Sequence, residues 1–373
     1  MTYQPQTYRY FLLTLDPVHI GTGGARLGRV DNPIVREPGT RLPKIPGSSL
    51  HGMIRAYAAY RYGKPQCAGQ GKNHCAQPTC PICYTFGHAR DKAGGRAGVV
   101  AISDARILLF PVYSMVGPVW VTSPGALYDA GFRPKEKNKA RFEVDKNEEG
   151  KAKWPNTLSS QDHLNLGWLM VERDKNGSEW EPREIFTEKD IPDPIRDRVV
   201  LVSDKLFSQI VNSNLEVRTS VAINPHTGAA EEGALFTYEA IPRATVLWMD
   251  VVVSDYRGAF PASDKVNKWW QQIKGDWEHG DIPEEYPQEK EEAITRALPV
   301  LASAGFRIPK SIPSTDKARK SFWKSFREAL LALQTDASRY QETGLPWKAP
   351  RDVLDSGLEW AEHLGVGGMG TRG

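Results

Sequence analysis

Four cysteines with close spacing are the residues in this sequence best suited to bind a metal ion. Cys67, Cys75, Cys80 and Cys83 follow the pattern C-x7-C-x4-C-x2-C, and His74 stands beside the second cysteine. Four thiolates suit tetrahedral Zn²⁺, and a CxxC pair can supply two ligands from one turn. We therefore expect a structural zinc site in a cysteine-rich loop over residues 60–95. Unligated cysteines in a reducing compartment and a redox-active CxxC pair are the alternatives.

A second group of residues, between positions 19 and 55, combines basic side chains with repeated glycines. The basic residues are Arg26, Arg29, Arg36, Arg41, Lys44 and Arg55. Glycines let a backbone approach a phosphate closely, and a helix that begins near Ser48 or Ser49 presents free N–H groups to an anion. A polyanion would add salt-dependent attraction. A solvated basic loop would have the same composition, so the pattern alone leaves both interpretations open.

Asp31 is the only carboxylate between Asp16 and Glu37 in this basic segment. Nearby cations are expected to lower its pKa and keep it ionised. An ionised carboxylate there can bind a divalent ion or orient the 2′-hydroxyl of an RNA. The alternative is a turn residue, because Asp-Asn-Pro is favourable turn chemistry. No nucleophile elbow or HExxH motif offers a competing catalytic set.

The elements that must position these residues indicate an α+β fold. We expect strands near residues 8–18, 99–112 and 246–256, a helix over residues 47–63, and a strand followed by a helix at 199–211. A turn at His226–Gly228 separates two strand-like runs. Two polar insertions are expected, one at 133–197 with weak periodicity and one at 256–350 that is helical. In the second, an apolar stripe predicts a helix packed on a core: Phe322, Phe326, Leu330 and Leu333.

Composition indicates a soluble globular chain. The 373 residues are 40% hydrophobic and 25% charged, with a net charge of +3, so any nucleic-acid surface must come from local clustering of charge. No apolar run approaches the length of a membrane span, and the N-terminal residues lack the pattern of a signal peptide. We therefore expect a cytoplasmic protein with no membrane association.

Several of these motifs, taken in order, resemble the RAMP superfamily of type III CRISPR effector complexes. HIGTGG, DNPIVRE and LPKIPGSSLHGMIR begin at residues 19, 31 and 42. LLFPVYSMVGPVWVTSPGAL, the segment 201–242 and the C-terminal LGVGGMGTRG make the Cmr-type (type III-B) backbone subunit the most similar. The resemblance covers roughly residues 8–125, 198–255 and 358–373. It implies a single RAMP domain over 1–373, with a ferredoxin-like, RRM-related core, a β-hairpin thumb at 222–240, a zinc knuckle and helical insertions.

The resemblance also implies a function. Subunits of this kind bind the guide crRNA, stack as further copies of themselves in a helical filament with other CRISPR complex subunits, and cleave complementary target RNA at regular intervals. The cleaving aspartate would be Asp31, with Mg²⁺ or another divalent ion, through attack by the target's own 2′-hydroxyl. His19 matches a position near that site, although a strand-end histidine bonded to the backbone is an equal alternative.

The resemblance implies RNA contacts for three further groups of residues. The expected RNA-binding residues are Arg36, Lys44, Ser48, Ser49, Arg55, Leu235, Phe236, Gly367, Gly368 and Met369. Leu235 and Phe236 would form an apolar wedge in the thumb, unless they are buried strand residues. His51 stands where the family often has lysine. The cysteine knuckle is more typical of Csm-type subunits and fused single-chain effectors. A non-cleaving backbone or capping subunit and a stand-alone zinc-containing RNA-binding protein are the alternative functions.

Overall fold

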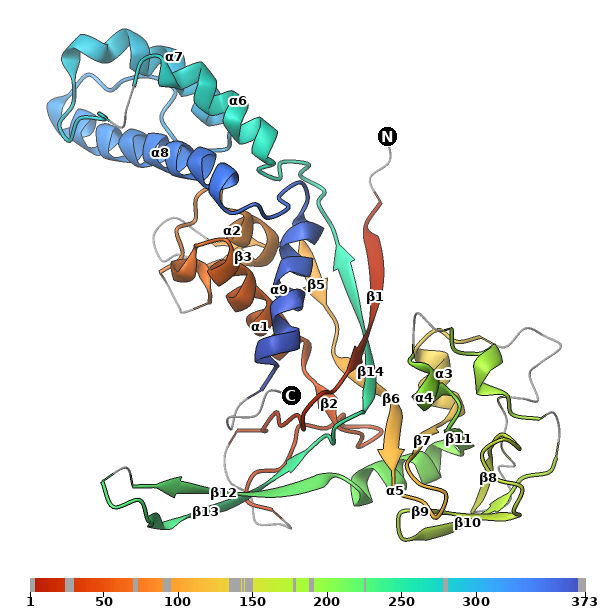
Figure 1. The fold of residues 1–373 in the computed structure, drawn as a ribbon. Helices are drawn as coiled ribbons and strands as arrows, with labels where there is room; N and C mark the ends of the chain where they lie inside the picture. The colour runs from red at the N-terminus through yellow and green to blue at the C-terminus, as the bar shows by residue number, and fades with distance from the viewer. Residues whose placement is uncertain are drawn as a thin grey trace. The chain divides into compact units, whose positions relative to one another are not determined.

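Strands and helices alternate along most of the chain in the computed structural model (Figure 1). The structure describes residues 4–23, 30–69, 73–89, 95–133, 142, 144, 150–176, 179–187, 191–224, 226–277 and 281–367. The chain divides into two units. The first comprises Met1–Thr7, His51–Ala101 and Val252–His363, and the second comprises Tyr8–Leu50, Ile102–Val251 and Leu364–Gly373.

The described elements have the following bounds. The strands are β1 Gln6–Leu13, β2 Lys44–Ile45, β3 Gly87–His88, β4 Arg96–Ala97, β5 Val100–Ile102, β6 Ala105–Val112, β7 Val119–Thr122, β8 Lys151–Lys153, β9 His163–Leu166, β10 Leu169–Arg173, β11 Val199–Val202, β12 Glu216–Ile223, β13 Ala230–Ala240 and β14 Val246–Val253. The helices are α1 Gly47–Arg61, α2 Pro81–Phe86, α3 Pro124–Asp129, α4 Asp193–Arg196, α5 Asp204–Ser213, α6 Ser263–Lys274, α7 Glu291–Ser303, α8 Asp316–Glu342 and α9 Pro350–Leu364.

A ten-stranded mixed sheet confirms the predicted α+β class. Its order is β1-β14-β6-β7-β11-β8-β10-β9, with β2 also on β6 and β5 also on β14. β6 runs antiparallel to β7, whereas β11 runs parallel to β7. The strand and helix expected at 199–211 are β11 and α5. Ser203 caps α5, because its side chain accepts a hydrogen bond from the Leu206 N–H.

The insertion with weak periodicity expected at residues 133–197 contains three short strands. Strands β8, β9 and β10 lie within it and extend the large sheet. β9 and β10 form an antiparallel hairpin whose turn contains Gly167 at φ +67°. Each of these strands has only three to five residues, which is too short to give a periodic signal in the sequence.

Helices α6, α7 and α8 form a helical module with its own apolar core (Figure 1). The predicted stripe on α8 is confirmed, because Phe322, Phe326, Leu330 and Leu333 are all buried. Trp277 packs against Trp323 and Phe326, with ring centroids 5.7 and 6.3 Å away. Burial of a large aromatic side chain contributes about 1.5–3 kcal/mol, so this core accounts for the folding of a segment otherwise rich in charge. Among the described residues, no helix combines the length and apolar character needed to span a membrane.

Candidate functional site

Strands β12 and β13 pair as a two-stranded antiparallel hairpin separate from the large sheet (Figure 1). At its turn the Asn224 N–H donates to the carbonyl of Ala229, and the Gly228 N–H donates back to the carbonyl of Asn224. Gly228 adopts φ +68°, a conformation that favours glycine. The turn expected at His226–Gly228 is therefore confirmed.

Large apolar side chains on the hairpin are exposed. Leu235 is 67% exposed and lies directly across from Val221, which is 39% exposed. The alternative that Leu235 is a buried strand residue is therefore wrong. Phe236 points to the other face, is half-buried, and contacts the Tyr238 ring at 6.4 Å. The two predicted wedge residues thus differ, and Leu235 is the one available to a ligand.

Asp31 is exposed and is held against the base of this hairpin. Its carboxylate accepts hydrogen bonds from the Thr237 N–H at 2.7 Å and from the Thr237 hydroxyl at 2.9 Å. The Asn32 N–H donates to the Thr237 carbonyl at 3.0 Å, which fixes the same segment. The main-chain and hydroxyl donors of Thr237 lower the pKa of Asp31, so the carboxylate is ionised at neutral pH. The expected direction is confirmed, and its cause among the described residues is Thr237. Arg26 and Arg29 of the loop lie outside the described residues.

The carboxylate and the exposed leucine share one face of the hairpin. Thr237 pairs with Thr219, and Leu235 pairs with Val221, two residues farther along the strand. Alternate residues of a strand point to the same face, and two residues span about 6.6 Å. An ionised carboxylate and an exposed apolar pair are therefore adjacent on a surface that a ligand can reach.

His19 is buried near the same hairpin base. Its Nδ1 lies 2.6 Å from the carbonyl oxygen of Glu239, and its ring packs edge-on against Tyr238. This geometry is the backbone-bonded alternative raised from the sequence. Gly367 approaches His19 so closely that a Cβ at Gly367 would lie 2.8 Å from the His19 carbonyl oxygen. Gly368 and Met369 lie outside the described residues.

Arg36 contacts the base of the hairpin through Glu239 of β13. Its guanidinium donates to the Glu239 carboxylate at 2.9 Å, to Asn212 at 3.0 Å and to the Ile34 carbonyl at 3.2 Å. The Glu239 side chain is only 9% exposed. These contacts hold the guanidinium against the base of the hairpin, and the RNA contact that the resemblance implies for Arg36 stays a prediction.

Lys44 and the start of α1 share one carboxylate, that of Asp104. Lys44 Nζ lies 2.5 Å from Asp104 Oδ2, and the Gly47 N–H donates to Asp104 Oδ1 at 2.7 Å. Burial opposes ionisation, but the hydrogen bonds from Lys44 and Gly47 hold the pKa of Asp104 below its usual value. The helix begins at Gly47, so the expectation that Ser48 or Ser49 caps it is wrong. Asp104 satisfies a free helix N–H instead, and Ser48 is exposed.

Arg55 is directed into the cysteine loop. Its Nε donates to the Cys67 carbonyl at 2.8 Å, and its Nη2 lies 3.0 Å from His74 Nδ1. Arg55 is 7% exposed. The expected contact with a phosphate is therefore not available in this conformation. His51, one turn earlier on α1, packs edge-on against Phe86, and burial together with the Arg55 charge lowers its pKa.

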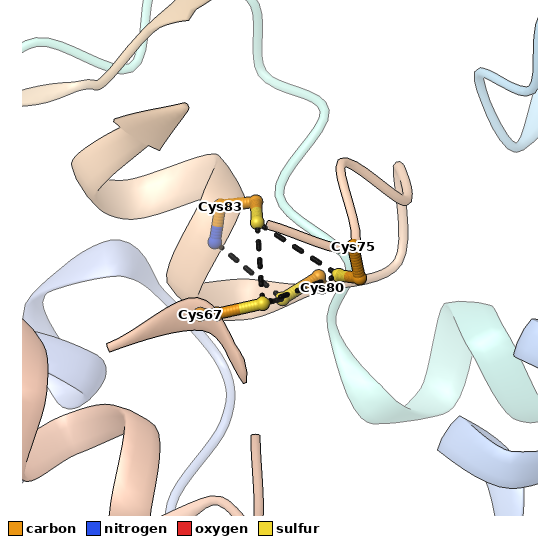
Figure 2. Close-up of side chains that lie close together, drawn as sticks. All are labelled: Cys67, Cys75, Cys80 and Cys83. Carbon is orange, nitrogen blue, oxygen red and sulfur yellow. Dashed lines mark hydrogen bonds between the residues drawn. The ribbon is translucent and has the colours of Figure 1, made fainter. Parts of the chain in front are cut away.

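The four cysteine sulfurs converge, as Figure 2 shows. Sulfur separations are 3.4 Å for Cys67–Cys75, 3.6 Å for Cys67–Cys83, 3.8 Å for Cys75–Cys83 and 3.9 Å for Cys80–Cys67. None is disulfide-bonded. Four sulfurs at the Zn–S distance of about 2.3 Å form a tetrahedron with edges of about 3.8 Å. The donor set and spacing therefore fit a tetrahedral metal ion, and His74 Nδ1 is already bonded to Arg55.

The sequence matches the model of the RAMP superfamily over residues 11–298. Over 256 residues it is 29% identical to the CRISPR system Cmr endoribonuclease Cmr4 of Pyrococcus furiosus, covering 67% of this chain and 82% of that protein. A 93-residue stretch is 47% identical to the CRISPR system Cms endoribonuclease Csm3 of Enterococcus italicus, covering 24% of this chain and 41% of that relative.

The fold is similar to a chain in the cryo-EM structure of the type III-B Cmr-beta complex bound to cognate target RNA. The TM-score is 0.50 at 16% identity, and the similarity covers 69% of this chain and 87% of that one. The family match covers more than half of the sequence and includes both Asp31 and the β12–β13 hairpin. This chain belongs to the RAMP superfamily.

Proposed function

We propose that this chain is a crRNA-binding backbone subunit of a type III CRISPR effector complex and that it cleaves target RNA through Asp31. The observation that carries the proposal is the ionised, exposed Asp31 carboxylate fixed to the hairpin beside Leu235. Membership of the RAMP superfamily and the endoribonuclease names of two relatives support it. In this proposal the hairpin is the thumb implied by the resemblance, carried on a ferredoxin-like core.

The chemistry follows from the position of the carboxylate. Leu235 and Val221 displace one target nucleotide from its neighbours by apolar contact. Asp31 accepts the proton of that nucleotide's 2′-hydroxyl. Mg²⁺ or another divalent ion held by the Asp31 carboxylate would supply stabilisation of the negative charge on the phosphate. The 2′-oxygen then attacks the adjacent phosphorus, and the bond to the 5′-oxygen breaks. The products are a 2′,3′-cyclic phosphate and a 5′-hydroxyl, which takes up the proton.

Cleavage of a labelled complementary RNA by the guide-loaded complex tests this proposal. We expect Asp31→Ala to lower the cleavage rate by about 10²–10⁴-fold, the usual contribution of a positioned acid–base group, while target binding persists. Asp16→Ala is the matched control, because Asp16 is also exposed and lies outside the hairpin contacts. Undiminished cleavage by Asp31→Ala would place catalysis elsewhere and leave this chain as a structural backbone subunit.

Dependence on a divalent ion is tested separately. The same reaction with and without Mg²⁺ distinguishes a metal-assisted step from one that the carboxylate performs alone. A 2′-deoxy nucleotide at the cleavage position removes the attacking group, so the proposed reaction stops there. Cleavage that continues at the 2′-deoxy position would exclude attack by the target's own hydroxyl.

We also propose that Cys67, Cys75, Cys80 and Cys83 hold one structural Zn²⁺. The sulfur separations of 3.4–3.9 Å support this assignment, because they match the edges expected for tetrahedral zinc. Elemental analysis of purified protein should give one zinc per chain and a loss of zinc in Cys80→Ser. His74→Ala is the control and should retain the metal. Loss of zinc only in His74→Ala would contradict a four-cysteine site.

A further inference from the structure

The first half of α8 carries an excess of positive charge. Residues 316–327 contain Lys317, Arg319, Lys320, Lys324 and Arg327 against a single acid, Asp316. The rest of the helix has the opposite balance, with Glu328, Asp336 and Glu342 against Arg339. α8 belongs to the first of the two units, whereas Asp31 and the hairpin belong to the second.

The two arginines in this half of α8 bind other residues of the protein. Arg319 donates to the Pro313 carbonyl at 2.9 Å and lies 3.5 Å from a Glu291 oxygen. Arg327 donates to the Ile282 carbonyl at 3.4 Å and lies 3.9 Å from Glu284. They contribute to the packing of the module.

The three lysines face solvent. Lys317, Lys320 and Lys324 are exposed, and within the part of the chain that the structure describes none of them has a hydrogen-bond or ion-pair partner. At 3.6 residues per turn they lie within about 60° of one another, and they span about 10 Å along the helix. Phe322 and Phe326 occupy the opposite, buried face. We call Lys317, Lys320 and Lys324 the basic face of α8.

The surroundings of the basic face favour a polyanion over a protein. Among the residues of 263–342 whose side chains the structure describes, no large apolar side chain is exposed, whereas protein interfaces depend on buried aromatic or aliphatic anchors. The exposed Ser321 flanks the lysines and can donate a hydrogen bond to a phosphate oxygen, whereas the Ser325 hydroxyl donates to the Ser321 carbonyl at 3.4 Å. Without an exposed ring to stack on bases, contact would be limited to the phosphate backbone and would be independent of sequence.

We propose that the basic face of α8 is a second RNA-binding surface, which holds the phosphate backbone of single-stranded RNA. The identity of the polyanion as RNA rests on the proposed function. The charge complementarity rests on the three unpaired lysines alone. Neutralising one phosphate of a single strand changes the slope of log K against log salt by about 0.7, so three lysines contribute about 2 to that slope.

The test compares two triple variants with equal changes of charge. The first is Lys317→Gln/Lys320→Gln/Lys324→Gln. The control is Lys268→Gln/Lys274→Gln/Lys348→Gln, which removes three exposed lysines elsewhere in the same unit. Guide-loaded complexes bind a complementary target RNA with or without long single-stranded flanks over a range of KCl concentrations. Circular dichroism verifies that both variants retain their helix content.

We expect the first variant to bind flanked target more weakly, with a salt slope reduced by about 2, and the control to match wild type. Cleavage at saturating target should be unchanged, so a failure here is distinguishable from failure at Asp31. Equal slopes in the two variants would overturn the proposal. Loss of another subunit from the complex with RNA binding intact would also overturn it and would identify a protein as the partner.

Discussion

A buried ion pair joins the end of α1 to the middle of α8. Lys64 Nζ lies 2.7 Å from Asp336 Oδ1, and the two side chains are 6% and 0% exposed. Arg339 is the next nearest cation, with its Nη1 3.8 Å from the same oxygen. Lys64 lies in the cysteine-rich loop, three residues before Cys67, so this pair connects that loop to the helical module.

Replacing one partner should destabilise this connection strongly. Asp336→Ala leaves the Lys64 ammonium buried without its counter-charge, which costs about 3–5 kcal/mol. Lys64→Met leaves the Asp336 carboxylate in the same position. The double variant Lys64→Met/Asp336→Leu removes both charges and fills the space with apolar groups, a change that is often neutral or stabilising. Each single variant is therefore expected to be less stable than the double variant.

Hydrogen exchange of the α8 amides in the full chain measures the effect directly, because it reports the free energy of local opening. A loss of about 3 kcal/mol corresponds to roughly 100-fold faster exchange. Lys268→Met, at an exposed position, is the control. If either single variant changes exchange no more than this control, or if the double variant is as damaging as the singles, the pair does not hold the module.

The same pair has a definite pH dependence. Burial, the largest single influence, lowers the pKa of Lys64, but the Asp336 carboxylate together with the nearby Cys80 and Cys75 sulfurs outweighs it, so the pKa is raised above its usual value. Burial also raises the pKa of the Asp336 carboxyl, so the pair is fully charged only between the two folded-state pKa values. A raised pKa means that the charged lysine stabilises the folded state at neutral pH. That contribution should disappear as the pH rises through the folded-state pKa. The free energy of local opening of α8, taken relative to the intrinsic base-catalysed exchange rate at each pH, should then fall in wild type but not in the double variant.

Three other predictions concern the candidate sites and the packing of α1. Thr237→Val removes the hydroxyl donor to Asp31 but keeps the main-chain donor, so the pKa of Asp31 should rise toward 3.8. A carboxyl ¹³C titration that shows no change would contradict the hydrogen bond from the Thr237 hydroxyl to Asp31. Gly357→Ala places a Cβ 2.4 Å from the Ile54 carbonyl oxygen. The cost of overpacking, about 1–3 kcal/mol, should exceed the gain in helix propensity of about 1 kcal/mol, so the variant should be less stable. An unchanged or higher Tm would refute this. Arg55→Ala removes the donor to the Cys67 carbonyl and should weaken metal retention by about 10–100-fold in chelator competition, whereas equal retention would separate Arg55 from the metal site.

The sequence predicted best the features that depend on nearby residues. The cysteines, the α8 stripe and the hairpin turn each lie within a short stretch, so spacing and periodicity carry the information. The partners of Asp31 and Gly47 could not be found in this way. Thr237 is 206 residues from Asp31, and Asp104 is 57 residues from Gly47. Such contacts exist only because distant segments meet in the sheet.

The basic residues between positions 19 and 55 also show what the sequence alone could not reveal. Arg36, Lys44 and Arg55 read as one phosphate-binding group in sequence. Each has instead a buried or half-buried acceptor elsewhere in the chain: Glu239, Asp104 and the Cys67 carbonyl. Charge counting cannot distinguish a free cation from one already paired. That distinction requires the tertiary structure, and it also separates the lysines of α8 from its arginines.

The two hydrogen bonds from Thr237 attach the Asp31 carboxylate to the hairpin. Two hydrogen bonds to one strand residue fix the distance between the carboxylate and Leu235, whatever the hairpin does as a whole. In an RNA-cleaving subunit, this attachment would set the position of the cleaved bond relative to Leu235, and not relative to the end of the guide–target duplex. A mismatch between guide and target that tilts the hairpin would also move the Asp31 carboxylate away from the bond to be cleaved. Discrimination against mismatched targets and cleavage itself would then depend on the same two hydrogen bonds.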